Sequence, residues 1–149
     1  MQILVLPYRK TTDGKIEFLL LKRRDGDFWQ GIAGGGEDDE TPIAAARRES
    51  FEKASISESA KYWKLDTQSS VPASAFPNAW KKWPEGTFVI PEYYFAVDVS
   101  GETISLSNEH SESRWCTFEE GVKLLKFESN KNGLWELNER LMLGPPKRV

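Results

Sequence analysis

Short runs of apolar, β-prone residues mark the strands that the sequence predicts. Residues 3–8 and 16–22 form two such runs, and the Asp13-Gly14 pair between them is a strong turn signal. They predict an N-terminal β-hairpin. Residues 62–71 and 87–99 predict two more strands, joined by a loop over 72–86 that contains Pro and Trp. This loop is long for a compact domain, and long loops of this kind are often functional.

Three other segments carry helix signals. Thr41 is placed to cap the segment 42–54, Pro42 suits its first helical position, and its alanines sustain a helix. Residues 117–120 have the capping-box pattern and predict a short helix. Leucines at positions 134, 137 and 141 form one apolar face, which predicts a last helix ended by the Gly-Pro-Pro of residues 144–146.

Composition and charge limit the class of protein. Of the 149 residues, 39% are hydrophobic and 29% charged, so we expect a single folded domain over residues 1–149. No apolar run approaches the roughly 18 residues that a membrane span needs. The net charge of −3 provides no general attraction for nucleic acid or anionic lipid. An anionic ligand must therefore be held by local donors or by a metal ion.

Cys116 is the only cysteine and His110 the only histidine. These counts exclude an intramolecular disulfide and a Cys/His zinc site, and the N-terminal segment lacks the features of a secretory signal. We therefore expect a cytoplasmic protein. We expect Cys116 to be buried. For His110 two interpretations are equally compatible with the sequence: a functional role beside Glu109, or a solvent-facing position in a loop. The sequence does not fix the oligomeric state, and a homodimer is compatible with it.

The glycine- and acid-rich stretch 33–40 and the helix after it carry the candidate chemistry. Three consecutive glycines let the backbone pass close to a ligand, and Glu49, Glu52 and Lys53 share one face of the predicted helix. Clustered carboxylates are the oxygen donors that Mg²⁺ or Mn²⁺ prefers. A purely structural interpretation suits the same residues, because acids complement a helix N-terminus and Glu49 can pair with Lys53.

This segment resembles the signature of the Nudix hydrolase family, G-x5-E-x7-R-E-U-x-E-E-x-G-U, in which U is a bulky apolar residue. Six positions match in register: Gly34, Glu40, Arg48, Glu49, Glu52 and Ile56. Residues 23–30, and Glu109-His110 ahead of Trp115, are similar to the dihydroneopterin triphosphate pyrophosphatase branch of the family.

The resemblance implies an α/β fold, the Nudix α/β/α sandwich around a mixed β-sheet. It also implies Mg²⁺- or Mn²⁺-dependent cleavage of a nucleoside diphosphate linked to another moiety, or of a pteridine or nucleoside triphosphate. A metal-bound water becomes a nucleophile near neutral pH, which suits this chemistry. The implied metal donors are Glu49, Glu52, Glu109 and a backbone carbonyl of Ala33 or Gly34.

The resemblance also assigns roles around these ligands. The implied catalytic set is Arg48 with the three glutamates, and the general base is either Glu49 or Glu109. Arg48 is expected to form an ion pair with Glu40, at least partly buried, that fixes the glycine loop on the helix. Glu49, Glu52 and Glu109 are expected to face a common cleft.

Four further side chains are candidates for substrate binding. Arg23 and Arg24 suit phosphate, although one of two adjacent strand residues normally points to solvent. Trp29 is first a core residue with an edge toward the pocket, and Trp80 either stacks on a substrate base or packs the loop onto the sheet. The basic and aromatic cluster 80–83 is a weak nucleic-acid signal in an acidic protein. The expected partner is a small nucleotide-like molecule, without nucleic acid or membrane.

The sequence departs from the family pattern at four positions. Lys53 replaces the second glutamate of the E-E pair, Ser50 occupies an apolar position, and Asp39 and Ser55 stand where glycines are usual. Lys53 matters most because an ammonium repels the ion that the carboxylates recruit. Its side chain is expected either to pair with Glu49 or to swing to solvent. The alternative function is therefore a degenerate Nudix domain that binds a nucleotide-like ligand with little or no turnover.

Overall fold

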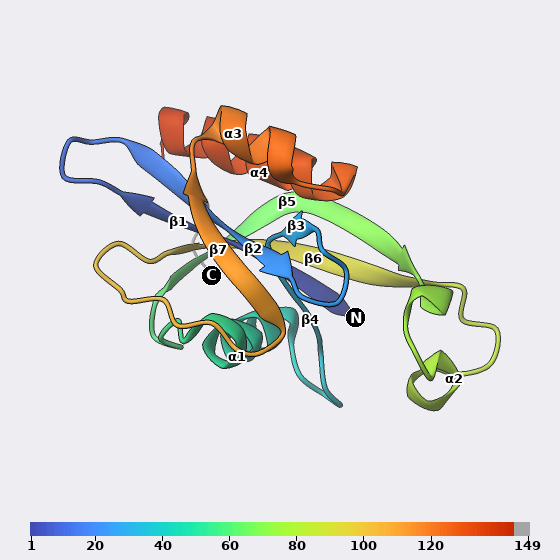
Figure 1. The fold of residues 1–149 in the computed structure, drawn as a ribbon. Coiled ribbons are helices and arrows are strands. Elements are labelled where there is room, and N and C mark those ends of the chain that lie inside the picture. The colour runs from blue at the N-terminus through green and yellow to red at the C-terminus, as the bar shows by residue number, and fades with distance from the viewer. Residues whose placement is uncertain (145–149) are drawn as a thin grey trace.

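The computed structural model describes residues 1–144 and contains one mixed sheet with helices on both faces (Figure 1). The strands run β3-β2-β1-β6-β5, with β4 paired to β1 and β7 paired to β2. Strands β1 and β6 are parallel, and the other pairs are antiparallel. The expected α/β/α sandwich is confirmed. In chain order the elements are β1 (Gln2–Lys10), β2 (Ile16–Arg23), β3 (Trp29–Gln30), β4 (Ile32–Gly35), α1 (Pro42–Ala54), β5 (Lys61–Pro72), the 3-10 helix η1 (Ala73–Ala75), α2 (Ala79–Lys82), β6 (Val89–Asp98), β7 (His110–Cys116), α3 (Phe118–Leu124) and α4 (Glu128–Leu143).

The central strand β1 separates two hydrophobic cores. Ile3 and Val5 pack on the face that α1 covers, whereas Leu4 and Leu6 pack on the opposite face with α4. Successive side chains of a strand point to opposite faces, so a strand covered on both sides is apolar almost throughout. This explains why β1 lacks the alternating pattern of a half-exposed strand.

Most predicted elements are confirmed, with shifted ends. The N-terminal hairpin turns at Gly14, which has a φ of 84°, and α1 spans the predicted 42–54. The final helix ends at Leu143 before Gly144, while the predicted Pro145 and Pro146 stop signals lie outside the described residues. Within residues 1–144, no helix has the length and apolar character needed to cross a membrane.

The structure adds elements that the sequence pattern did not predict. The 72–86 loop contains η1 and α2, which lie beyond one end of the sheet (Figure 1). Strand β7 pairs with β2, although residues 111–114 are exposed and polar. His110 begins β7 and is buried, so a solvent-facing loop position for it is wrong.

Candidate active site

The glycine loop meets α1 through a close contact between Gly34 and Glu49. Gly34 lies in β4 opposite Ile3 of β1, and a Cβ atom on it would lie 2.3 Å from the Glu49 carboxyl carbon. Thr41 caps α1 by accepting a hydrogen bond of 3.3 Å from the Ala44 amide. Only glycine at position 34 therefore lets the buried Glu49 carboxylate lie against the loop backbone.

Arg48 ties this loop to the helix. Its Nε and Nη2 atoms donate to the two carboxylate oxygens of Glu40 at 2.8 and 3.0 Å, and Nη2 also donates to the Gly35 carbonyl at 2.8 Å. Its Nη1 atom donates to Glu49 at 3.0 Å and to Glu52 at 3.2 Å. These bonds raise the pKa of Arg48 and lower the pKa of Glu40. The predicted ion pair between Arg48 and Glu40 is confirmed.

Lys53 lies at the centre of the carboxylate cluster. Its ammonium donates to the backbone carbonyl of Ala33 and lies 3.4 Å from Glu49 Oε2 and 3.3 Å from Glu109 Oε2. Only 12% of the Lys53 side chain is exposed. Of its two expected positions, the structure shows the one paired with Glu49 and adds the contact with Glu109.

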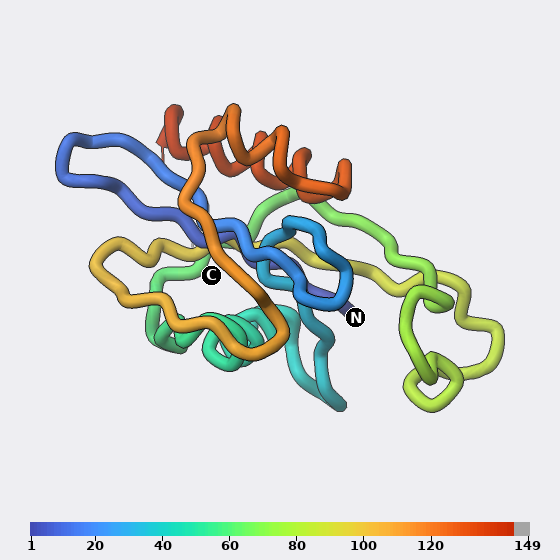
Figure 2. The backbone as a smooth tube through the Cα atoms, viewed as in Figure 1, coloured from blue at the N-terminus to red at the C-terminus, as the bar shows by residue number. Residues whose placement is uncertain are grey.

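Glu109 reaches α1 because the segment before it runs along the end of that helix (Figure 2). The amides of Ser105 and Ser107 donate to the carbonyls of Ala54 and Lys53 at 3.2 and 2.9 Å. Glu109 thus lies on the same side of the sheet as Glu49. The Glu52 side chain is half exposed and bonds to Arg48 instead.

The arrangement does not form an open metal site. Within residues 1–144, no group of three or more Asp, Glu, His or Cys side chains is placed to hold a metal ion. Three of the implied donors, namely Ala33, Glu49 and Glu109, contact the Lys53 ammonium. As they stand, these donors fit an ammonium and not a protein-bound Mg²⁺ ion.

A cleft of about 740 Å³ lies beside this cluster. Lys53 lines it, but Glu49, Glu52 and Glu109, which were expected to face a common cleft, are not among its lining residues. Its charged lining includes Arg23, Asp25, Lys53 and Lys82, next to the backbone of residues 33–35. Buried polar side chains and three phenylalanines also line it: Gln2, Gln30, Glu92 and Asn130, with Phe28, Phe76 and Phe127. The cleft therefore combines cationic side chains with polar and aromatic ones.

Glu92 is the buried acid of that pocket. It lies opposite Gln2 in the parallel register of β1 and β6, and burial raises the pKa of its carboxyl group. Asn130 accepts a hydrogen bond from the Gly31 amide at 3.3 Å and donates to the Tyr94 hydroxyl at 3.4 Å. Sequence reasoning missed these residues. For Glu92 the available signal was a charged side chain among the apolar residues of a predicted strand, and for Asn130 there was none.

The four proposed substrate-binding residues have different positions. Arg23 lines the cleft, and its guanidinium donates to Asp25 at 2.9 and 2.7 Å. Arg24 is not among the residues that line the cleft, and its guanidinium donates to the carbonyls of Asn108 and His110 at 3.0 and 3.4 Å. Trp29 packs on the core with α4 and is not among the residues that line the cleft.

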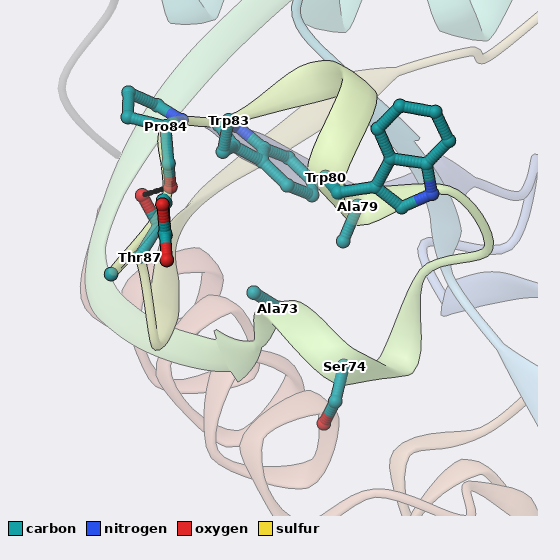
Figure 3. Close-up of a pocket in the computed structure, with 9 residues that line it drawn as sticks. Ala73, Ser74, Ala79, Trp80, Trp83, Pro84 and Thr87 are labelled. Atoms are coloured by element: carbon teal, nitrogen blue, oxygen red, sulfur yellow. Dashed lines mark hydrogen bonds between the residues drawn. The ribbon is translucent and has the colours of Figure 1, made fainter.

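Trp80 projects from α2 and is 77% exposed. It lines a separate pocket of about 490 Å³ together with Trp83, Ala73 and Thr87 (Figure 3). Trp83, not Trp80, forms an aromatic contact within this loop, with ring centroids 5.3 Å from Phe76. The structure thus places Trp80 outside the cleft that contains Arg23 and Lys53.

His110 is buried beside the carboxylate cluster. Its two ring nitrogens have no hydrogen-bond partner within residues 1–144. Desolvation, together with the positive charges of Lys53 and Arg23, lowers its pKa to about 4. The imidazole is therefore neutral at neutral pH.

Comparisons with known proteins agree with this architecture. The NUDIX domain model matches residues 3–136. The dihydroneopterin triphosphate diphosphatase of Haemophilus influenzae is 31% identical over 134 residues, covering 89% of this chain and 83% of that protein. Among solved structures, a NUDIX hydrolase structure from Listeria monocytogenes has a TM-score of 0.89 and 40% identity, covering 100% of this chain and 99% of that one.

The dihydroneopterin triphosphate pyrophosphohydrolase of Escherichia coli has the same fold, with a TM-score of 0.72 and 26% identity. The alignment covers 92% of this chain and 94% of that one. Nudix proteins generally use a divalent metal such as Mg²⁺. The chain belongs to the NUDIX hydrolase family, an enzyme family of pyrophosphohydrolases.

Proposed function

We propose that the protein hydrolyses a phosphoanhydride bond of a pteridine or nucleoside triphosphate whose ring is a 2-amino-4-oxo system. The observation that carries this proposal is one cleft whose lining includes the cations Arg23 and Lys53 together with the buried acid Glu92. The named relatives act on dihydroneopterin triphosphate, which contains such a ring. We further propose a cytoplasmic location, which suits a chain whose one cysteine is free and buried.

The polar pocket supports the choice of ring. A carboxylate accepts two hydrogen bonds side by side, and the 2-amino-4-oxo ring of a pterin or guanine presents two adjacent N–H donors. Adenine lacks that donor pair. Phe28, Phe76 and Phe127 supply apolar walls for a flat ring, while Gln2 beside Glu92 supplies further hydrogen-bonding groups.

The catalytic candidates are Arg48, Glu49, Glu52 and Glu109. The contacts of Glu49 and Glu109 with neighbouring cations support different roles for these two acids. Both carboxylate oxygens of Glu49 contact cations, Oε1 with Arg48 and Oε2 with Lys53. Glu109 is half exposed and has one such contact, so it is the better candidate to take a proton from the attacking water. In this proposal Mg²⁺ or Mn²⁺ arrives as part of the substrate, the metal complex of the triphosphate.

The test is pyrophosphate release from dihydroneopterin triphosphate, GTP and ATP in the presence of Mg²⁺. We expect kcat/KM for the first two substrates to exceed that for ATP by at least tenfold. Glu92→Gln should reduce this preference about tenfold, because an amide offers only one acceptor atom. The control Glu58→Gln, at an exposed position, should leave the preference unchanged. Equal rates on all three substrates would contradict the assignment of the ring.

The ammonium of Lys53 within the metal-donor set favours a second candidate function, ligand binding with little or no turnover. The two functions differ in one observable. A degenerate domain would bind a non-hydrolysable triphosphate analogue in the same cleft but release no pyrophosphate from any member of the panel.

A further inference from the structure

Lys53 has the surroundings of a bound cation. An ammonium has three N–H donors, and this one has three oxygen partners: the Ala33 carbonyl, Glu49 and Glu109. A lysine side chain normally extends into solvent, whereas Lys53 is almost fully enclosed. Three oxygen partners and low exposure are typical of a cation held in one position, not of a lysine on the protein surface.

The fold fixes this position from three sides. Lys53 occupies the last turn of α1, Ala33 is held by pairing of β4 with β1, and Glu109 follows the segment bonded to the end of α1. The other oxygen of Glu49, together with Glu52, is bound to Arg48. The neighbouring carboxylates are therefore already neutralised by side chains of the same helix.

The spacing of the two carboxylates does not suit a divalent ion at the position of the ammonium nitrogen. Mg²⁺ binds oxygen at about 2.0–2.1 Å. The Glu49 and Glu109 oxygens lie 3.4 and 3.3 Å from the Lys53 nitrogen, which is ion-pair spacing. A second cation among the same donors would also be repelled by the ammonium.

We propose that the Lys53 ammonium is the fixed cation of this site and occupies the position that other family members give to a protein-bound divalent ion. The free protein then holds no Mg²⁺ among Ala33, Glu49 and Glu109. Lys53 also lines the cleft, so its charge faces the phosphate chain of a ligand. Glu109 is the partner that a phosphate oxygen can displace, because its side chain is half exposed and Glu49 is buried.

The first experiment measures Mn²⁺ binding to the free protein by calorimetry and electron paramagnetic resonance. We expect weak binding by the parent and by Lys53→Arg, which keeps the charge. Lys53→Met, which removes the charge, and Lys53→Glu, which adds a ligand, should bind Mn²⁺ at least tenfold more tightly. The matched control is Lys123→Met, since Lys123 is an exposed lysine in the last turn of α3. Equal Mn²⁺ affinity in the parent and Lys53→Glu would overturn the proposal.

The second experiment measures binding of inorganic tripolyphosphate in the presence of a metal chelator. The parent and Lys53→Arg should bind it, and Lys53→Met should lose at least tenfold in affinity. Unchanged affinity in Lys53→Met would show that Lys53 does not contact phosphate. Thermal unfolding of each variant verifies that it is folded. Neither readout requires turnover, so an inactive parent would count against the proposed hydrolysis without affecting this inference.

Discussion

At the scale of single residues, Arg48 determines the shape of the acidic cluster. One guanidinium binds both oxygens of Glu40, the Gly35 carbonyl, Glu49 and Glu52. Bidentate, charge-assisted bonds of this type are stronger than bonds between neutral groups. Replacement of Arg48 by alanine would therefore leave several partly buried acceptors without a donor.

Arg48→Ala should lower the free energy of unfolding by about 3 kcal/mol, the scale for breaking a buried ion pair. Chemical denaturation measures this loss. The control is Lys131→Ala, because the ion-pair partner of Lys131, Glu128, is 84% exposed. That change should cost less than about 1 kcal/mol. An Arg48→Ala variant as stable as the parent would mean that the contact has no structural role.

His110 makes stability depend on pH. Its pKa is lowered to about 4 in the folded protein by burial and by nearby positive charges, against 6.5 for a free histidine. Between these two values the unfolded chain binds more protons, so the stabilisation is complete above about pH 6.5 and is lost as the pH falls toward 4.

The expected loss from this one group is on the order of 3 kcal/mol across that range. His110→Gln, which does not titrate, should show a flatter dependence of unfolding free energy on pH between 6.5 and 4. Because carboxylates titrate at the lower end of the range, the informative quantity is the difference between the two proteins. Parallel pH profiles would show that His110 keeps an ordinary pKa.

At the scale of elements, α1 delivers Arg48, Glu49, Glu52 and Lys53 to the site, and both of its ends follow recognisable rules. Thr41 caps the first turn, and Ser55, the residue after the last helical residue Ala54, caps the C-terminal end with a φ of 58°. Family members usually have glycine at this position, where the left-handed conformation costs no strain. The serine therefore keeps the backbone geometry at an energetic cost.

Ser55→Gly should raise the free energy of unfolding by roughly 1 kcal/mol, because glycine removes the left-handed strain. The loss of the Ser55 hydroxyl bond to the Ser105 carbonyl, 3.3 Å long and exposed, offsets little of this gain. Ser59→Gly is the control at a position without positive φ and should destabilise slightly. Chemical denaturation of both variants gives the answer. A destabilised Ser55→Gly variant would contradict this account of the helix end.

Local patterns predicted the elements whose side chains enter the core or cap a helix, such as the hairpin and α1. They did not predict β7, because its exposed residues are polar and the strand exists through backbone pairing with β2. The pairing of Arg48 with Glu40 was predictable from the signature. The contacts of Lys53 with Ala33 and Glu109 depend on how the sheet, the helix and a distant loop are brought together, which no local pattern encodes.

At the scale of the whole molecule, the sandwich brings two kinds of chemistry into one cleft. Helix α1 and β4 contribute Lys53 and the glycine loop, and β6 with the start of α4 contributes Glu92 and Asn130. Both faces of the central strands are filled with apolar side chains, which makes the frame rigid. A ligand that spans the cleft must therefore combine a flat polar ring with a phosphate chain.

We expect the protein to cleave such a ligand between its α- and β-phosphates. The most direct measurement follows dihydroneopterin triphosphate and Mg²⁺ by phosphorus NMR in the presence of the parent protein, with Glu49→Gln as the inactive control. The triphosphate signals should be replaced by those of pyrophosphate and a monophosphate ester, in equal amounts. A bound triphosphate that stays intact, or products consisting of orthophosphate and a diphosphate ester, would contradict it.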